Sequence, residues 1–321
     1  MTHSQSQHMR FLKRFSLTVG VILLLVFGLN FVIDPFNKNG QFNLDVPKSD
    51  VALKMHYPLY KSLEYRQQPA TTVILGDSRA NALKSSYFAD LGRSDVYNMA
   101  YGGGTAAEII DSFWYIQNIG VVKNVWIGLP FNLFNPSSSS SRFREVESLR
   151  EKALPYYLST LVTKASVLTA GSALAGKALK SEAPDMNKEQ FWSSQLGVTT
   201  SKHYGNWQEP TELKQALIDV ARYCRDNNIK LMFFIPPTHV DLQNKIDEFG
   251  LRDEYQAYLD FLGQMAPVYD FDFPNTTTRN KELFKDPYHA NQEVNQNIAK
   301  WLLRGEDETL SVDFVRYLPR K

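Results

Sequence analysis

The chain has 321 residues, of which 43% are hydrophobic and 13% aromatic, which is enough for one mid-sized domain or two smaller ones. Its 35 Lys and Arg residues nearly balance its 34 Asp and Glu residues, so its net charge argues against nucleic acid as the main partner. The single cysteine, Cys224, excludes an intrachain disulfide and a zinc site built from cysteines. We expect no metal site.

The first predicted element is an uncharged apolar stretch at residues 15–33. A helix of this length, at about 1.5 Å per residue, nearly spans a hydrocarbon core of roughly 30 Å. Three basic residues precede it and Asp34 follows it, so the positive-inside rule keeps residues 1–14 in the cytoplasm and the rest of the chain outside. A cleaved signal peptide is the alternative. Its apolar stretch would usually be shorter and end in small residues, so we favour a transmembrane anchor.

After a predicted linker at residues 34–69, short apolar stretches alternate with helical patterns. The predicted strands are residues 72–75, 96–99, 121–127, 229–235 and 268–271. Apolar spacing predicts helices around residues 109–114, 213–224 and 294–302, with Cys224 on a core-facing side. This alternation indicates an α/β fold with a parallel sheet that is covered on both faces and binds ligands at the carboxyl ends of its strands.

Residues 136–210 interrupt this alternation. The segment opens with Pro136 and a run of serines, and its middle, residues 153–180, has no acidic residue. We expect a helical insertion packed on the domain; the alternative is a lid, or a surface against anionic lipid or a membrane partner. The domain is then expected over residues 70–305, followed by a C-terminal tail at residues 306–321.

A candidate nucleophile, Ser78, follows the first predicted strand in Gly-Asp-Ser-Arg. Serine needs a base to remove its proton and a carboxylate to orient that base. His289 follows the last predicted strand, and Asp286 lies three residues before it, close enough to fix its tautomer. Each motif alone is common, but their joint placement predicts a Ser-His-Asp triad. An α/β-hydrolase elbow fits less well, because that fold has several strands before its serine.

These motifs resemble those of the SGNH, or GDSL-like, hydrolase family. The resemblance implies a flavodoxin-like three-layer fold, with Ser78, Asp286 and His289 as its triad. It implies an oxyanion hole formed by the backbone N–H groups of Ser78 and Gly103, where Gly103 fits the family spacing best and Gly102 lies close behind.

A further family block, usually Gly-x-Asn-Asp, is altered here to residues 128–135. By resemblance Asn132 is the expected side-chain donor to the oxyanion, with Asn135 in reserve. We further expect Gly102, Arg79 and His239 near the substrate. Arg79 would either steer an anionic substrate or pair with a local carboxylate, and His239 would either line an acceptor pocket or be an ordinary loop residue.

The resemblance extends to anchored members that act on bacterial surface polymers, such as alginate O-acetylation proteins and the thioesterase-like protein of teichoic-acid D-alanylation. It implies an enzyme in the bacterial inner membrane, with its domain periplasmic or extracellular. The expected reaction adds or removes O-acyl groups, acetyl by preference, on an exported polysaccharide, with a polytopic membrane acyltransferase as partner. A non-catalytic scaffold of such a system and a general esterase are the alternatives. Glycines 102–104 lack the pattern of a nucleotide site, so no cofactor is expected.

Overall fold

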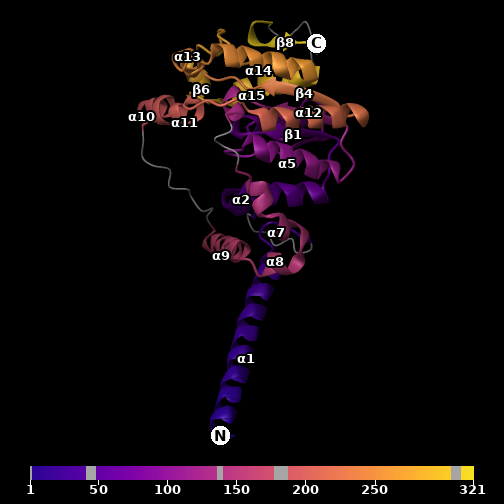
Figure 1. The fold of residues 1–321 in the computed structure, drawn as a ribbon, viewed down its shortest axis with the longest axis vertical. Coiled ribbons are helices and arrows are strands. Elements are labelled where there is room, and N and C mark those ends of the chain that lie inside the picture. The colour runs from indigo at the N-terminus through magenta and orange to yellow at the C-terminus, as the bar shows by residue number, and fades with distance from the viewer. Residues whose placement is uncertain (1, 41–47, 136–139, 177–186, 305–311) are drawn as a thin grey trace. The chain divides into compact units, whose positions relative to one another are not determined.

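A computed structural model of the chain describes residues 2–40, 48–135, 140–176, 187–304 and 312–321 (Figure 1). It divides into two compact units. The smaller comprises residues 1–67 and 144–182, and the larger comprises residues 68–143 and 183–321. The two units are described separately below.

The described part of the smaller unit is helical. Its helices are α1 (Thr2–Ile33), α2 (Lys48–Gln67), α7 (Glu147–Glu151), α8 (Ala153–Tyr157) and α9 (Thr160–Ala175), while the short α6 (Arg142–Glu145) lies at the boundary between units. Within α1, Gln7–Ile33 is apolar and long enough to cross a membrane, and almost none of its most apolar part is buried. The N-terminal apolar helix is therefore present as predicted.

The end of α1 is tied to α8 and α9. Asn30 is fully buried, and its amide donates to the carbonyl of Tyr157 at 2.7 Å and to the hydroxyl of Thr163 at 2.9 Å. Asp34 ends the helix with a φ of +42°, and its carboxylate accepts from the Tyr156 hydroxyl at 2.8 Å. The ring of Phe27 packs on Tyr157 with 4.8 Å between centroids. These contacts make α1, α8 and α9 parts of one packed unit.

The predicted linker at residues 34–69 is largely a folded element. Most of it is α2, whose Leu59 and Leu63 are buried in a cluster with Val162 and Ala165 of α9. The helix kinks at His56, two residues before Pro58, and the ring of His56 accepts from the N–H of Leu59 at 3.3 Å. Proline has no backbone N–H, and it is tolerated here because it lies in the first turn after the kink, where a backbone N–H would have no intrahelical acceptor.

The larger unit is built on a six-stranded sheet in the order β2-β1-β3-β4-β5-β8. The strands are β1 (Thr72–Gly76), β2 (Val96–Asn98), β3 (Asn124–Gly128), β4 (Lys230–Ile235), β5 (Val268–Asp270) and β8 (Arg316–Leu318). The first five are mutually parallel, and β8 pairs antiparallel with β5. The predicted α/β class and mostly parallel sheet are confirmed, while β8 corrects the predicted tail: the domain continues beyond residue 305.

Helices flank both faces of this sheet. Ile74 and Trp126, paired in register on β1 and β3, share a core cluster with Val294 and Ile298 of α15 (Gln292–Arg304). The opposite face is covered by α5 (Ala106–Gln117) and α12 (Thr211–Asp226), which contact β1 and β4 respectively. The remaining helices are α3 (Ser78–Asn81), α4 (Ser85–Ala89), α10 (Lys188–Ser194), α11 (Thr200–Tyr204), α13 (Val240–Glu248) and α14 (Arg252–Met265).

The predicted insertion at residues 136–210 is divided between the units. Residues 144–182 belong to the smaller unit, and residues 183–210 belong to the larger one. The second part forms α10, a single π-helical turn at Gln195–Thr199, and α11. The insertion is helical where it is described, but it is not one element packed on one domain. Its run Pro136–Ser139 lies outside the described residues.

Candidate active site

The nucleophile turn joins β1 to α3. β1 is buried along its whole length, and Asp77 caps α3 by accepting from the N–H of Arg79 at 2.9 Å. Gly76 has a φ of +153°, and a Cβ there would lie 2.5 Å from the Cβ of Ala80 and 2.8 Å from the carbonyl oxygen of Gly128. Only glycine fits between these groups. Ser78 is therefore held as the first residue of α3, at the carboxyl end of a central strand.

Asp286 and His289 lie on a two-stranded hairpin. The strands β6 (Phe284–Asp286) and β7 (His289–Ala290) pair antiparallel, with Asp286 in register with His289. The carboxylate accepts from the His289 ring Nδ1 at 2.8 and 2.9 Å, and from the backbone N–H groups of Tyr288 and His289 at 2.8 and 3.1 Å. The two-residue turn thus sets the geometry of the acid–histidine pair.

The imidazole of His289 connects this hairpin to Ser78. Its Nε2 lies 2.7 Å from the Ser78 hydroxyl oxygen. Burial acts to raise the pKa of Asp286, but the hydrogen bonds from His289 and the backbone outweigh it and lower that pKa, so the carboxylate is ionised at neutral pH. An ionised carboxylate only accepts, so Nδ1 carries the imidazole proton and Nε2 is free to accept from the Ser78 hydroxyl. The three predicted triad residues therefore form one continuous hydrogen-bond chain.

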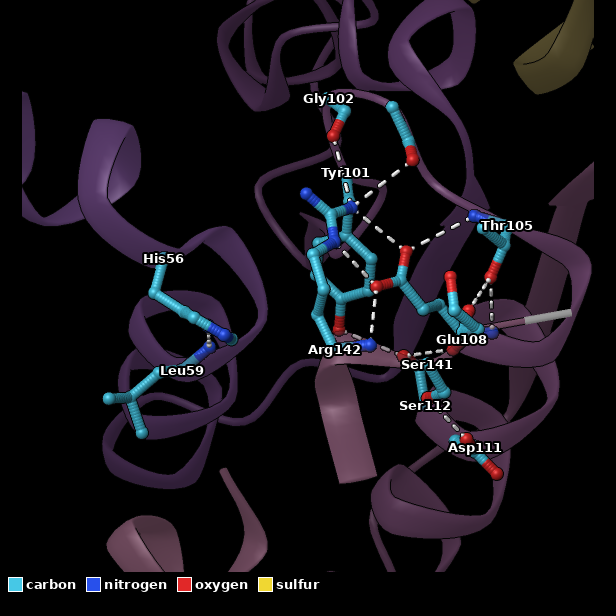
Figure 2. Close-up of polar contacts among 12 residues, drawn as sticks. His56, Leu59, Tyr101, Gly102, Thr105, Glu108, Asp111, Ser112, Ser141 and Arg142 are labelled. Atoms are coloured by element: carbon cyan, nitrogen blue, oxygen red, sulfur yellow. Dashed lines mark hydrogen bonds and ion pairs between the residues drawn. The ribbon is translucent and has the colours of Figure 1, made fainter. Parts of the chain in front are cut away.

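The glycine loop before α5 is fixed from one side by Arg142, as Figure 2 shows. Arg142 donates to the carbonyl oxygens of Gly102 at 3.1 Å and Gly103 at 3.2 Å, and it pairs with the fully buried Glu108 at 2.7 Å. Glu108 also accepts from the N–H of Thr105, which caps α5 in a capping box. One ion pair therefore ties the loop to the first turn of the helix that follows it.

The hydrogen bond from Arg142 to the Gly102 carbonyl determines which way the N–H of Gly103 faces. In a trans peptide the carbonyl and the following N–H point in opposite directions, so a Gly102 carbonyl held by Arg142 turns the N–H of Gly103 away from Arg142. Gly103 lines the same cavity as Ser78, and its φ of +63° favours glycine. Gly102 is not among the cavity-lining residues in the described part of the chain, so the structure favours Gly103 over Gly102 for contact with a bound molecule.

Asn132 is oriented by the residue next to the nucleophile. Arg79 donates to the Asp77 carboxylate at 2.6 and 2.9 Å and to the Oδ1 of Asn132 at 2.6 Å. The side chains of Arg79 and Asp77 are only 5% and 7% exposed. A guanidinium only donates hydrogen bonds, so the amide atom of Asn132 that faces Arg79 must be the acceptor Oδ1. The donor group Nδ2 of Asn132 therefore points away from Arg79. Of the two expectations for Arg79, the structure shows the ion pair.

A cavity of about 390 Å³ opens over Ser78 and His289. A large part of its wall comes from the second part of the predicted insertion. The side chains that line it are mostly polar and include Asp77, Arg79, Thr105, Asn132, Ser140, Gln195, Thr199, Lys202, His203 and Tyr288. Leu133 is the one aliphatic side chain among the lining residues that the structure describes. The sequence offered no motif for this wall, because its residues follow no spacing tied to the triad.

His203 is the most perturbed group in this wall. Burial, followed by the positive charges of Arg79 and Lys202, lowers its pKa to about 4. Its Nδ1 lies 3.2 Å from the hydroxyl of Tyr288, whose ring in turn lies under the Arg79 guanidinium. His203 is therefore neutral at pH 7 and presents a hydrogen-bonding ring to the cavity rather than a charge.

Of the two expectations for His239, the structure fits the ordinary loop residue, and it gives the reserve residue Asn135 a structural contact. His239 does not line this cavity; it caps α13 by accepting from the N–H of Asp241 at 3.2 Å, and its ring packs edge-on against Trp192. Asn135 donates to the carbonyl of His203 at 3.0 Å, so its amide holds the wall of the cavity. Among the residues that the structure describes, no group of three or more His, Cys, Asp or Glu side chains is placed to hold a metal ion.

No family model matches the chain, and no curated protein does. Among solved structures, the chain is similar to a candidate acylhydrolase from Bacteroides fragilis, with 12% sequence identity and a TM-score of 0.39. The similarity covers 77% of this chain and 96% of that one. A likeness at this distance indicates neither a reaction nor a substrate.

Proposed function

We propose that the chain transfers acyl groups through a covalent acyl-Ser78 intermediate. The observation that carries this proposal is the chain of hydrogen bonds from the Ser78 hydroxyl to His289 and from His289 to the Asp286 carboxylate. A serine hydroxyl at 2.7 Å from an imidazole nitrogen, with that imidazole oriented by a buried carboxylate, is the arrangement that activates serine for attack on an ester carbonyl.

In the proposed mechanism, Ser78 attacks an ester carbonyl while His289 takes its proton at Nε2. The oxyanion that forms is held by the backbone N–H groups of Ser78 and Gly103 and by the Nδ2 of Asn132. The N–H of Ser78 belongs to the first turn of α3, so it has no intrahelical acceptor to compete with the oxyanion. His289 then donates its proton to the departing alcohol. In the second step it activates water or an acceptor hydroxyl, which takes the acyl group and frees Ser78.

For the substrate, we propose a short acyl group, acetyl by preference, on a hydroxyl of an exported polysaccharide. The many polar side chains around the cavity support a hydroxylated carrier. Its single described aliphatic side chain, Leu133, supports a short acyl group, because a long fatty acyl chain would need an extended apolar wall. The apolar helix α1 supports work at a membrane, with the catalytic unit on its outward side. In this proposal a polytopic membrane acyltransferase supplies the acyl group when the reaction runs towards transfer.

The test uses the full-length chain in detergent with p-nitrophenyl acetate, p-nitrophenyl decanoate and acetylated or free oligosaccharides. We expect acetate to be preferred over decanoate, and intact mass spectrometry to detect an acetyl adduct on Ser78. Ser78→Ala should lower kcat by about 10⁴- to 10⁶-fold and abolish the adduct. Ser86→Ala, on the exposed surface of α4, is the matched control and should change neither.

Each alternative has its own result in this experiment. Turnover of decanoate at least as fast as acetate, without action on any oligosaccharide, would indicate a general esterase. Absence of both adduct and product in every condition would contradict catalysis. A non-catalytic scaffold would also keep its cellular role in the Ser78→Ala chain, whereas an enzyme would lose it.

A further inference from the structure

The helix α9 lacks the polarity of a helix on the surface of a water-soluble protein. Its buried side carries Ser166, Thr169 and Ser172 beside two apolar residues of the core cluster, while its outward side carries Val167, Leu168 and Leu174. These three apolar side chains are 57%, 36% and 91% exposed. A helix in water places its apolar side inward. Small and hydroxyl-bearing side chains inward with apolar ones outward is the pattern of helices that contact lipid.

The helix α9 contacts α1 near the C-terminal end of α1. The hydroxyl of Thr163 on α9 accepts from the amide of Asn30, near the C-terminal end of α1. The exposure of α1 changes at the same level: its side chains are exposed from Gln7 to Leu25, and from Val26 onwards most are wholly or partly covered by the smaller unit. The smaller unit therefore begins to cover α1 only in its last two turns.

The length of α1 sets where a bilayer would end. About 20 residues at 1.5 Å each cross a hydrocarbon core of roughly 30 Å. Counting 20 residues from Phe15, the first residue after the three basic ones, reaches Asp34 at the end of the helix. A bilayer that begins at Phe15 would therefore end near Asp34, one turn beyond Asn30. Because α9 contacts α1 at Asn30, it would lie about 6 Å inside that boundary, within the depth of roughly 5–10 Å at which interfacial helices lie.

We propose that α9 lies in the bilayer interface at the C-terminal end of α1, with its outward apolar side against lipid acyl chains. Leu154 on α8, which contacts both α1 and α9, is also exposed, at 62%. Lys164 is exposed on α9, and its long apolar stem lets the ammonium reach the headgroups while the helix stays at the interface. The occupant of this surface is lipid rather than a protein, because α9 contacts α1 at the end of the exposed apolar stretch of α1 that is long enough to cross a membrane.

The experiment places a fluorescent label at single introduced cysteines in the full-length chain reconstituted into phosphatidylcholine vesicles. Cys224 is only 1% exposed, and burial raises its thiol pKa to about 12, so it does not compete for the label. The label is introduced by Leu174→Cys on α9, Leu24→Cys on α1, and Ser148→Cys on the exposed surface of α7 as the control. Nitroxide-bearing lipid quenches labels in the bilayer, and iodide quenches labels in water.

We expect the label at position 174 to lose most of its fluorescence to nitroxide lipid and little to iodide, as at position 24. The label at position 148 should do the reverse. Quenching at position 174 that matches position 148 would overturn the proposal and leave the surface to a protein partner. Position 24 accessible to iodide would overturn it as well, because α1 would then not cross the bilayer. Neither readout depends on ester turnover, so the result is separate from the proposed catalysis.

Discussion

The side chain of Asn132 offers the sharpest test of the proposed oxyanion hole. Its Oδ1 is occupied by Arg79 at 2.6 Å, which turns Nδ2 away from the ion pair. Asn132→Ala removes this donor, and the loss of one oxyanion donor costs about 10²- to 10³-fold in kcat, or about 3–4 kcal/mol of transition-state stabilisation. We expect KM for p-nitrophenyl acetate to change much less than kcat, because the donor acts on charge that develops in the transition state.

Arg79 should act on catalysis through Asn132, and a double-mutant cycle measures this. Arg79→Lys keeps a positive charge against Asp77 and so avoids the cost of about 3–5 kcal/mol of leaving that buried carboxylate unpaired. The ammonium lacks the planar fork that donates to Asp77 and Asn132 together, so the amide loses its fixed orientation. We expect Arg79→Lys to lower kcat about 10-fold or more alone, and to have almost no further effect in the Asn132→Ala chain.

Two results would refute this reasoning. Arg79→Lys and Asn132→Ala could lower kcat independently, so that their effects multiply in the double variant. Alternatively, Asn132→Ala could leave kcat unchanged. Asn135→Ala serves as the matched control, because this neighbouring amide donates to the carbonyl of His203 instead of facing the triad. It should lower the melting temperature more than it lowers kcat.

Two further predictions concern the hairpin and the cavity wall. In Asp286→Asn the new amide N–H₂ faces Nδ1 of His289 and moves the ring proton to Nε2, so kcat should fall about 10⁴-fold in stopped-flow assays; a loss below about tenfold would contradict the proposed role of the carboxylate. His203 has its pKa lowered from its ordinary 6.5 to about 4, so between these pH values the unfolded chain binds a proton that the folded chain does not. The free energy of unfolding should therefore fall by about 3 kcal/mol as pH falls through this window, with no further loss from His203 below pH 4. Denaturant unfolding of His203→Gln should lack this component, and equal pH slopes in the two chains would contradict it.

The triad could be predicted because its signals are local. Ser78 directly follows a buried strand, and Asp286 and His289 are only three residues apart. The position of each group therefore depends on the backbone of a few neighbouring residues, which a short stretch of sequence reveals. The mostly parallel sheet was predictable for the same reason, since each of its five parallel strands carries its own apolar stretch. The catalytic role of these residues stays a prediction until turnover is measured.

Long-range contacts could not be predicted in this way. Arg142 reaches the loop carbonyls at Gly102 and Gly103 from 39 or more residues away, and nothing in its local sequence distinguishes it from other surface arginines. His203 lies in the predicted insertion with no motif around it, although the fold brings it into the wall of the cavity. β8 carries too short an apolar pattern to read as a strand, and it becomes one only by pairing with β5.

The smaller unit is discontinuous along the chain, and this affects synthesis and truncation. Its α1 and α2 emerge from the ribosome long before α9, because residues 68–143 are made in between. In the proposed membrane-anchored protein, α1 would therefore enter the membrane before the helices that pack on its end are made. A truncation that starts at residue 68 would remove α1 and α2 but keep residues 144–182, whose Val162 and Ala165 would lose their packing partners. A chain shortened for solubility should therefore lack both residues 1–67 and residues 144–182. If only the first segment is removed, the second exposes apolar surface, which lowers solubility.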